Sequence, residues 1–400
     1  MHRPNSPASK LTLISAIVAV GTFASIAYAT PVVTAVSGSV TQGGTLTISG
    51  SGFGTKSPAQ PYFWAPMNGN MNPSSLGVLQ SWATSPTSEF TYTAGCGPAP
   101  GTGCAAGMPA NGSSADEWAI GIYSPSYYGS GNDWNSYGQK TYVYRKSKRN
   151  FSYTNNGSTN VKLIRVWGTS SSMINNYPDF YWSVYNGRIG VEDVPQNGTN
   201  DYTMPAATVT VAEGPVNQWY SEEYELASNS TATSADGDFR IAINGGPDLV
   251  SFPNTQWEQN TITMKTASGS GGDGTMKLLY PVHFLYENGG NWIPAASGSQ
   301  YFTADVYADT TWARVMIGNS PTFSATTDRE IQIPVQWSAG SIQVNVNVNA
   351  FPAGQKMYLF VVDSSENASV GFPITAGSSS SSTSSTTPVA PDPPSDVTVQ

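Results

Sequence analysis

Charged residues make up only 11% of the 400 residues, and the sequence has two cysteines and two histidines. A structural zinc centre usually takes four Cys or His ligands, so this sequence argues against one. The 26 acidic residues outnumber the 17 basic ones, and nucleic acid is an improbable partner for so acidic a chain. No long run has helical periodicity, whereas glycine (40), tyrosine (21) and tryptophan (11) are plentiful. The composition is typical of an all-β extracellular protein.

Residues 1–29 have the pattern of a signal peptide. Arg3 and Lys10 precede an apolar run at 11–26, and Ala27-Tyr28-Ala29 supplies the small-x-small pattern that signal peptidase accepts. A single anchoring helix is the alternative, but a bilayer span wants about 20 apolar residues and this run is shorter. No other stretch is apolar enough to cross a bilayer. We therefore expect a secreted or cell-surface protein with no transmembrane segment after cleavage.

Export makes the two cysteines interpretable. Cys96 and Cys104 lie in a Gly/Pro loop, GCGPAPGTGC, and an oxidising compartment favours their pairing. The sequence therefore predicts a disulfide that staples a short loop.

The two ends of the chain have matching β patterns. Residues 31–54, PVVTAVSGSVTQGGTLTISGSGFG, give two short strands around a Gly-Gly turn, and two strands alone are marginal in water. Four more β-patterned stretches lie between 311 and 375. We expect residues 30–57 and 310–377 to form one split immunoglobulin-like sandwich. The alternative is two unrelated β segments that flank a central domain.

The segment ISGSGFG (48–54) resembles the opening of an IPT/TIG domain, an immunoglobulin-like module common in extracellular proteins. The run VVDSSENASVGFPI, which ends at Ile374, resembles its closing strands. The resemblance implies an immunoglobulin-like fold for about 90 residues of the chain.

Residues 58–309 break into many alternating strands with Asn-Gly and Gly-Gly turns. Examples are the stretches 141–154, 160–168, 179–193, 207–213, 217–227, 237–246, 276–289 and 300–309. This spacing predicts an inserted jelly-roll β-sandwich. The Ser/Thr-rich and then Pro-rich residues 378–400 are expected to form a flexible tail.

The body resembles, more loosely, the concanavalin A-like jelly rolls of polysaccharide lyases and carbohydrate-binding proteins. The strands NVKLIRVWG, QWYSEEYEL, DGDFRIAINGG and QYFTADVYAD carry this resemblance. The Glu-x-Asp-x-x-Glu strand of related glycosidases is absent, which argues against glycoside hydrolysis. The resemblance implies no cofactor other than a structural calcium, for which the sequence offers Asp236, Asp238, Asp305 and Asp309, although such residues more often serve turns.

Basic residues are concentrated in one short stretch. Seven of them lie between 140 and 165: Lys140, Arg145, Lys146, Lys148, Arg149, Lys162 and Arg165. In a strand, Tyr142, Tyr144, Lys146 and Lys148 alternate onto one face, and Arg145 and Arg149 fall on the other. A solvated strand edge is one interpretation, since lysines there block aggregation. An anion-binding site is the other.

The aromatic residues beside these cations favour a glycan ligand, because aromatic rings stack on sugars and Arg or Lys pairs with carboxylates. We expect strands 142–149 and 161–167 to lie side by side and to form a groove for an acidic polysaccharide. The predicted lining residues are Tyr144, Lys146, Lys148, Arg165, Trp167, Tyr181 and Tyr224. Core packing is the alternative for the aromatics, and His283, alone in an apolar strand, fits a structural role better than catalysis.

Three classes of function remain open. A noncatalytic polysaccharide-binding or adhesion protein fits best. A lyase that cleaves uronate chains by β-elimination is the first alternative, with Tyr or Lys as base. A structural surface subunit is the second. The sequence does not decide whether the protein is an enzyme.

Overall fold

The computed structural model describes residues 30–66, 78–80, 91–107, 117–123, 140–151, 160–169, 178–185, 188–195, 215–227, 238–243, 250–252, 277–287, 298, 300–349 and 351–383. Strands dominate these residues, and every strand pair among them is antiparallel. The chain is therefore all-β, as predicted. Within the described part of the chain, no helix is long and apolar enough to cross a membrane.

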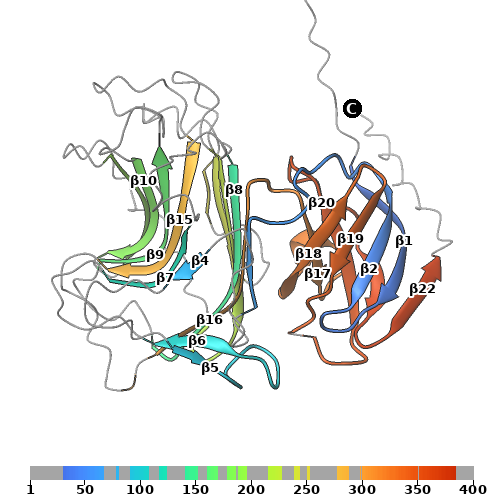
Figure 1. Ribbon diagram of the computed structural model, residues 1–400, viewed down its shortest axis with the longest axis horizontal. Helices are drawn as coiled ribbons and strands as arrows, with labels where there is room; N and C mark the ends of the chain where they lie inside the picture. Colours follow the sequence, from blue (N-terminus) through green and yellow to red (C-terminus); the bar gives the residue numbers. More distant parts are fainter. Residues whose placement is uncertain are drawn as a thin grey trace, which may run out of the picture.

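The first group of strands, which we call the split sandwich, joins the two ends of the chain (Figure 1). Its strand order is β21 (Phe372–Thr375), β20 (Lys356–Val362), β17 (Arg314–Gly318), β18 (Arg329–Trp337), β19 (Ser341–Asn345), β2 (Thr45–Ser51), β1 (Val32–Ser39) and β22 (Ser379–Thr383). A short 3-10 helix, η2 (Phe323–Ala325), lies between β17 and β18. The N-terminal strands thus complete a sheet that the C-terminal strands begin. The expectation of a flexible tail from residue 378 is wrong for residues 379–383, because β22 pairs with β1.

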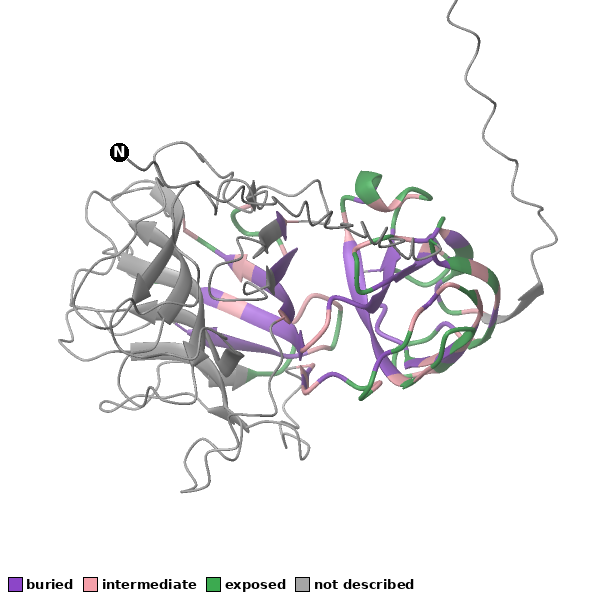
Figure 2. Ribbon diagram, turned by 90° about the horizontal axis from the view of Figure 1, so that it is seen from above, coloured by how far each residue is buried: buried purple, intermediate pink, exposed green. Residues whose placement is uncertain are grey.

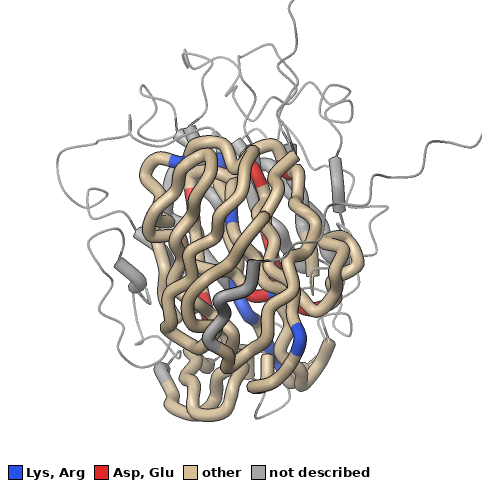
Figure 3. Tube along the Cα trace, turned by 90° about the vertical axis from the view of Figure 1, so that its right-hand side faces the viewer, with Lys and Arg blue, Asp and Glu red and all other residues tan. Residues whose placement is uncertain are grey.

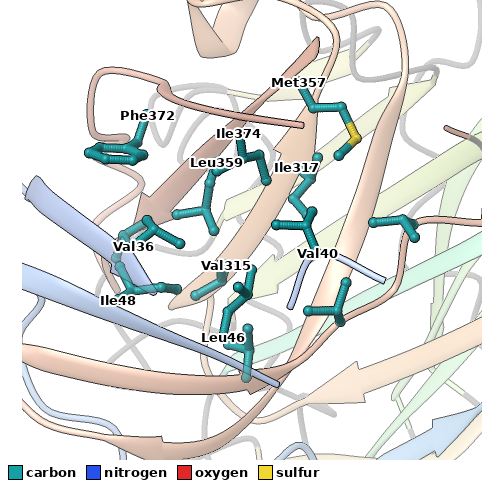
Figure 4. Close-up of a cluster of buried hydrophobic side chains, with 14 of the residues drawn as sticks. Val36, Val40, Leu46, Ile48, Val315, Ile317, Met357, Leu359, Phe372 and Ile374 are labelled. Atoms are coloured by element: carbon teal, nitrogen blue, oxygen red, sulfur yellow. The ribbon is translucent and has the colours of Figure 1, made fainter. Parts of the chain in front are cut away.

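Alternation in β2 explains why this strand joins the sandwich. Leu46 and Ile48 are buried, while Thr45 is exposed and Thr47 is half-buried. The buried pair packs in one apolar cluster with residues of β1, β17, β19, β20 and β21 (Figure 4). The predicted joining of the two chain ends is confirmed, and the alternative of two unrelated β segments is wrong.

Close packing explains the glycine and the phenylalanine of the segment ISGSGFG. A Cβ atom on Gly50 would lie 1.9 Å from the carbonyl oxygen of Val32 and 2.6 Å from the ring of Phe53. Only glycine fits such an approach of backbone and ring. Phe53 is buried in the same cluster, and its carbonyl accepts a hydrogen bond from the Trp337 indole at 3.2 Å. The motif therefore closes one end of the sandwich.

The inserted body forms two more sheets. The middle sheet has the order β14 (Val250–Phe252), β13 (Asp238–Ile243), β12 (Tyr220–Ala227), β8 (Lys140–Arg149), β16 (Tyr301–Asp309), β6 (Cys104–Gly107) and β5 (Thr91–Thr93), and β3 (Phe63–Ala65) also pairs with β16. The outer sheet has the order β11 (Arg188–Pro195), β10 (Pro178–Tyr185), β9 (Asn160–Thr169), β15 (Lys277–Glu287), β7 (Glu117–Tyr123) and β4 (Val78–Gln80). Figure 1 shows the middle sheet between the outer sheet and the split sandwich.

The middle sheet packs directly on the split sandwich. Tyr142, Tyr144 and Tyr307 of the middle sheet share one cluster with Met316 and Ile331 of the sandwich. Figure 2 shows buried residues running through the described parts of both units. The inserted body is therefore anchored through an apolar and aromatic contact.

Two sequence expectations concern local features of the body. Cys96 and Cys104 form a disulfide with a Cα–Cα distance of 5.4 Å, which confirms the predicted pairing. The strand expected at 207–213 lies outside the described residues.

Candidate functional site

The expected adjacency of the two basic strands is wrong. β8 pairs with β12 and β16 in the middle sheet, whereas β9 pairs with β10 and β15 in the outer sheet. One charge pair favours the pairing with β12, because Glu222 lies opposite Arg145 in the register. A cross-strand pair of opposite charges stabilises an antiparallel sheet.

Tyr144 and Lys146 lie in the contact between the middle sheet and the split sandwich. The Tyr144 hydroxyl lies 2.9 Å from Glu330 Oε2 and 2.8 Å from the Arg329 carbonyl oxygen, and it can donate its one proton to either acceptor. Lys146 Nζ lies 2.9 Å from Asp328 Oδ1 and 3.0 Å from Glu330 Oε1. Both side chains are buried and paired with protein groups. They leave no surface on which a polysaccharide can bind.

Three carboxyl groups surround the single ammonium of Lys146. Burial raises the pKa of Asp305 to about 6, against the hydrogen bond from Asn349. Burial also raises the pKa of Glu330 to about 8, and the nearby Asp305 charge adds to this shift against the attraction of Lys146. Burial alone would lower the pKa of Lys146, but the carboxylates of Glu330 and Asp328 raise it. The cluster is therefore a structural one, built on a charged lysine.

Tyr224 belongs to a second buried network, on the opposite face of the middle sheet. Its hydroxyl donates to Glu222 Oε2 at 3.0 Å and accepts from Arg145 Nη2 at 3.2 Å. Arg145 also forms an ion pair with Glu222. Burial raises the pKa of Tyr224 well above its usual range, and the charge of Glu222 adds to the shift. This tyrosine is thus a core residue that holds an ion pair.

Lys148, unlike the buried Lys146, is half-buried. Its Nζ lies 5.2 Å from the centre of the Phe302 ring on the neighbouring strand. The ammonium of Lys148 is thus held by a cation–π contact within the middle sheet. It does not bring Lys148 to β9, which lies in the outer sheet.

The outer sheet, described by its backbone and register, brings together predicted residues that are distant in sequence. Tyr181 of β10 lies directly opposite Arg165 of β9, and His283 of β15 lies opposite Arg165 on the other side. The same row continues to both edges of the sheet. In order it contains Glu192, Tyr181, Arg165, His283, Gly121 and Gln80. We call it the Arg165 row.

The rows on either side of it are apolar except for one aspartate at the edge strand β11. One runs Val191, Trp182, Ile164, Phe284 and Ile120. The other runs Asp193, Phe180, Val166, Val282, Ile122 and Leu79. Successive residues of a strand alternate between its two faces, so the Arg165 row belongs to one face and the apolar rows to the other. Trp167, two positions from Arg165, shares the face of the Arg165 row. One face of the sheet is thus suited to a core and the other to a polar ligand.

Sequence reasoning found Arg165, Trp167 and Tyr181 but assigned His283 to a structural role. The signal that distinguishes His283 is its place between Val282 and Phe284, which pair with apolar residues of β7 and β9. Glu192 and Gln80 gave no signal, because only the register reveals that they continue the row.

Calcium does not fit the two aspartates of β16. Asp309 forms an ion pair with Lys56, and Asp305 lies close to Lys146. At each site a lysine Nζ occupies space beside the carboxyl group, and calcium takes six to eight oxygen ligands. Among the described residues, no three His, Cys, Asp or Glu side chains form a metal-binding group. Asp236 lies outside the described residues.

Figure 3 looks at the molecule from the side of the split sandwich and shows acidic and basic positions close together. Of the cations in β8, Arg145 pairs with Glu222 and Lys146 pairs with Asp328 and Glu330, so these two cations meet opposite charges inside the protein. A second charged group there centres on Arg314, which contacts Glu223, Glu225 and Glu366.

No protein-family model matches the chain, and IPT/TIG membership stays a prediction. No curated protein matches it either. Among solved structures, a variant of the alginate lyase Aly36B in complex with alginate trisaccharide is 12% identical, with 58% of this chain and 87% of that chain covered and a TM-score of 0.36. The cellulose induced protein Cip1 is 12% identical, with 59% and 91% covered and a TM-score of 0.33. An alginate lyase from Chlorella virus is 9% identical, with 56% and 89% covered and a TM-score of 0.36. All three TM-scores are low, so these similarities do not indicate what this chain does.

Proposed function

We propose that this is an extracellular protein that binds an anionic polysaccharide along the Arg165 row of the outer sheet. The observation that carries the proposal is the register that sets Tyr181 and His283 on either side of Arg165. The apolar rows on the opposite face leave the Arg165 row as the polar face of this sheet. The leader pattern at 1–29 supports the extracellular location.

The residue types of the row match the chemistry of an acidic sugar chain. A guanidinium pairs with a carboxylate through two parallel hydrogen bonds, and the rings of Tyr181 and Trp167 offer faces for sugar stacking. Neighbouring strands lie about 4.8 Å apart, so the row from β11 to β7 extends over roughly 19 Å. That length accommodates several sugar units of one chain.

Replacement of Arg165 with alanine is expected to abolish retention of the protein on alginate or pectate affinity gels. The reason is the loss of the cation at the centre of the row. Wild-type retention should also weaken as salt rises, because exposed charges are screened within about 8 Å at physiological ionic strength. The matched control is Lys356→Ala, an exposed cation in β20 of the split sandwich. Equal retention of both variants, with thermal unfolding unchanged, would contradict the proposal.

A second candidate function is β-elimination of a uronate chain, and the position of His283 favours it. This reaction needs a cation that neutralises the carboxyl group, a base that removes the adjacent proton and an acid that protonates the leaving oxygen. Arg165, His283 and Tyr181 are groups of these three kinds in consecutive strands. Histidine titrates near neutral pH and is a common general base.

Product absorbance distinguishes the two candidates. Elimination creates a double bond that absorbs near-ultraviolet light, so a lyase raises the absorbance of an alginate or pectate solution, and His283→Ala should stop the rise while gel retention persists. A wild-type protein that is retained but produces no absorbance is a binding protein only. If it neither binds nor cleaves and instead pellets as polymers, a structural surface subunit is the better reading.

A further inference from the structure

The two chain crossings between the split sandwich and the inserted body meet at one buried pair. The chain leaves the sandwich after β2 and returns after β16. Lys56 lies on the outgoing crossing and Asp309 at the end of β16. Lys56 Nζ is 2.5 Å from Asp309 Oδ2, and the two side chains are 1% and 3% exposed. The pair therefore links the start and the end of the insertion.

A hydroxyl, a backbone amide and two aromatic rings contact this pair. The Tyr307 hydroxyl donates to Asp309 Oδ2 at 2.6 Å and accepts from Lys56 Nζ at 3.1 Å. The Thr310 amide donates to Asp309 Oδ1 at 2.8 Å. The centres of the Tyr307 and Trp337 rings lie 5.9 Å and 5.4 Å from Nζ. The amine and the carboxyl group are thus fixed against each other with water excluded.

Lys56 differs from Lys146, the other buried lysine with carboxyl partners among the described side chains. Burial lowers the pKa of Lys56 in spite of the Asp309 charge, and burial raises the pKa of Asp309 in spite of the Lys56 charge. Both directions favour a neutral amine beside a protonated carboxyl group. Lys146 has two close carboxylates, its pKa is raised, and it remains a non-nucleophilic ammonium.

We propose that Lys56 and Asp309 condense into an intramolecular amide that covalently closes the base of the inserted body. Nζ attacks Cγ of Asp309, the N–C bond forms and the bond from Cγ to Oδ2 breaks. Oδ2 leaves as water, with its own acid proton and one proton from Nζ. No oxidant, reductant or further reactant is required.

The neighbours supply what the reaction needs. The Tyr307 hydroxyl lies between Nζ and Oδ2 and relays the proton from the amine to the leaving oxygen. The Thr310 amide stabilises the negative charge that develops on Oδ1 in the tetrahedral intermediate. The product replaces two buried titratable groups, whose charged forms are costly to desolvate, by a neutral amide. This inference is independent of the glycan proposal, because it uses none of the outer sheet.

The test is the mass of the full-length exported protein after reduction, alkylation and denaturation. The measured mass of the wild type should be one water molecule below the mass calculated from its sequence. Proteolysis should yield one branched peptide that joins Lys56 to Asp309. Lys56→Arg should have the full calculated mass. Lys146→Arg is the matched control and should still lack one water. Asp309→Asn should be lighter by one ammonia, since that is the leaving group of an asparagine.

A wild type with its full calculated mass would overturn the proposal. A missing water that maps to any site other than the Lys56–Asp309 branched peptide would overturn it as well, because aspartate can also lose water within its own backbone.

Discussion

Replacing Arg314 with alanine is expected to lower the free energy of unfolding by about 3–5 kcal/mol, as is typical when one partner of a buried charge cluster is removed. Arg314 begins β17, and its guanidinium is buried between the sandwich and the middle sheet. Its Nη1 lies 2.7 Å from Glu366 Oε1, and its Nη2 lies 2.8 Å from Glu225 Oε1. Without the guanidinium these carboxylates stay buried and lose the positive charge that offsets the cost of their desolvation. Urea unfolding followed by tryptophan fluorescence measures the change.

Two further variants show whether the effect comes from charge. Lys356→Ala removes an exposed cation and should change stability by less than about 0.5 kcal/mol. Arg314→Lys keeps one charge but cannot contact several carboxylates through a planar fork, so its loss should be intermediate. An Arg314→Ala protein as stable as Lys356→Ala would show that the cluster does not hold the two units together.

The sequence predicted the strands and the split sandwich because both rest on local alternation and on the need for partners. Leu46 and Ile48 alternate with threonines, and their apolar face had to meet strands from elsewhere in the chain. The four later stretches were the only ones of the right length and spacing outside the body. The pairing of β2 with β19 fulfils that need.

The same reasoning grouped the residues of β8 correctly by face but misjudged what covers each face. Tyr142 and Tyr144 do share one face, and Arg145 contacts Glu222 on the other. A strand pattern does not reveal that a second domain packs on the face of Tyr144 and Lys146. Arg145 and Lys146, which look like part of a binding patch in the sequence, therefore form internal ion pairs.

The Arg165 row escaped the sequence for a different reason. Its members come from six strands, and a shift of one residue in any of them would move a side chain to the opposite face. Register of this kind depends on the loops and on the packing of the whole sheet. Arg165 and Tyr181 were recognised individually, whereas the place of His283 beside them required the fold.

Replacing Ile48 with alanine is expected to cost about 2–5 kcal/mol, the usual range when a fully buried Ile is cut to alanine. Ile48 is completely buried and lies between Val36 of β1 and Ile342 of β19 in the register. It packs in the cluster that also contains Val315 and Leu359 (Figure 4). The cavity would open at the seam between the two chain ends. Denaturant unfolding of the exported protein measures the loss.

Thr47→Ala, one position earlier on the half-buried face, is the matched control and should cost less than about 1 kcal/mol. Ile48→Val should fall between the two, at about 0.5–1.5 kcal/mol, because it removes a single methylene group. Equal losses for Ile48→Ala and Thr47→Ala would contradict the packing of β2 in the split sandwich. The graded order would show instead that stability depends on apolar volume at this seam, since backbone hydrogen bonds to β1 and β19 are the same in all three variants.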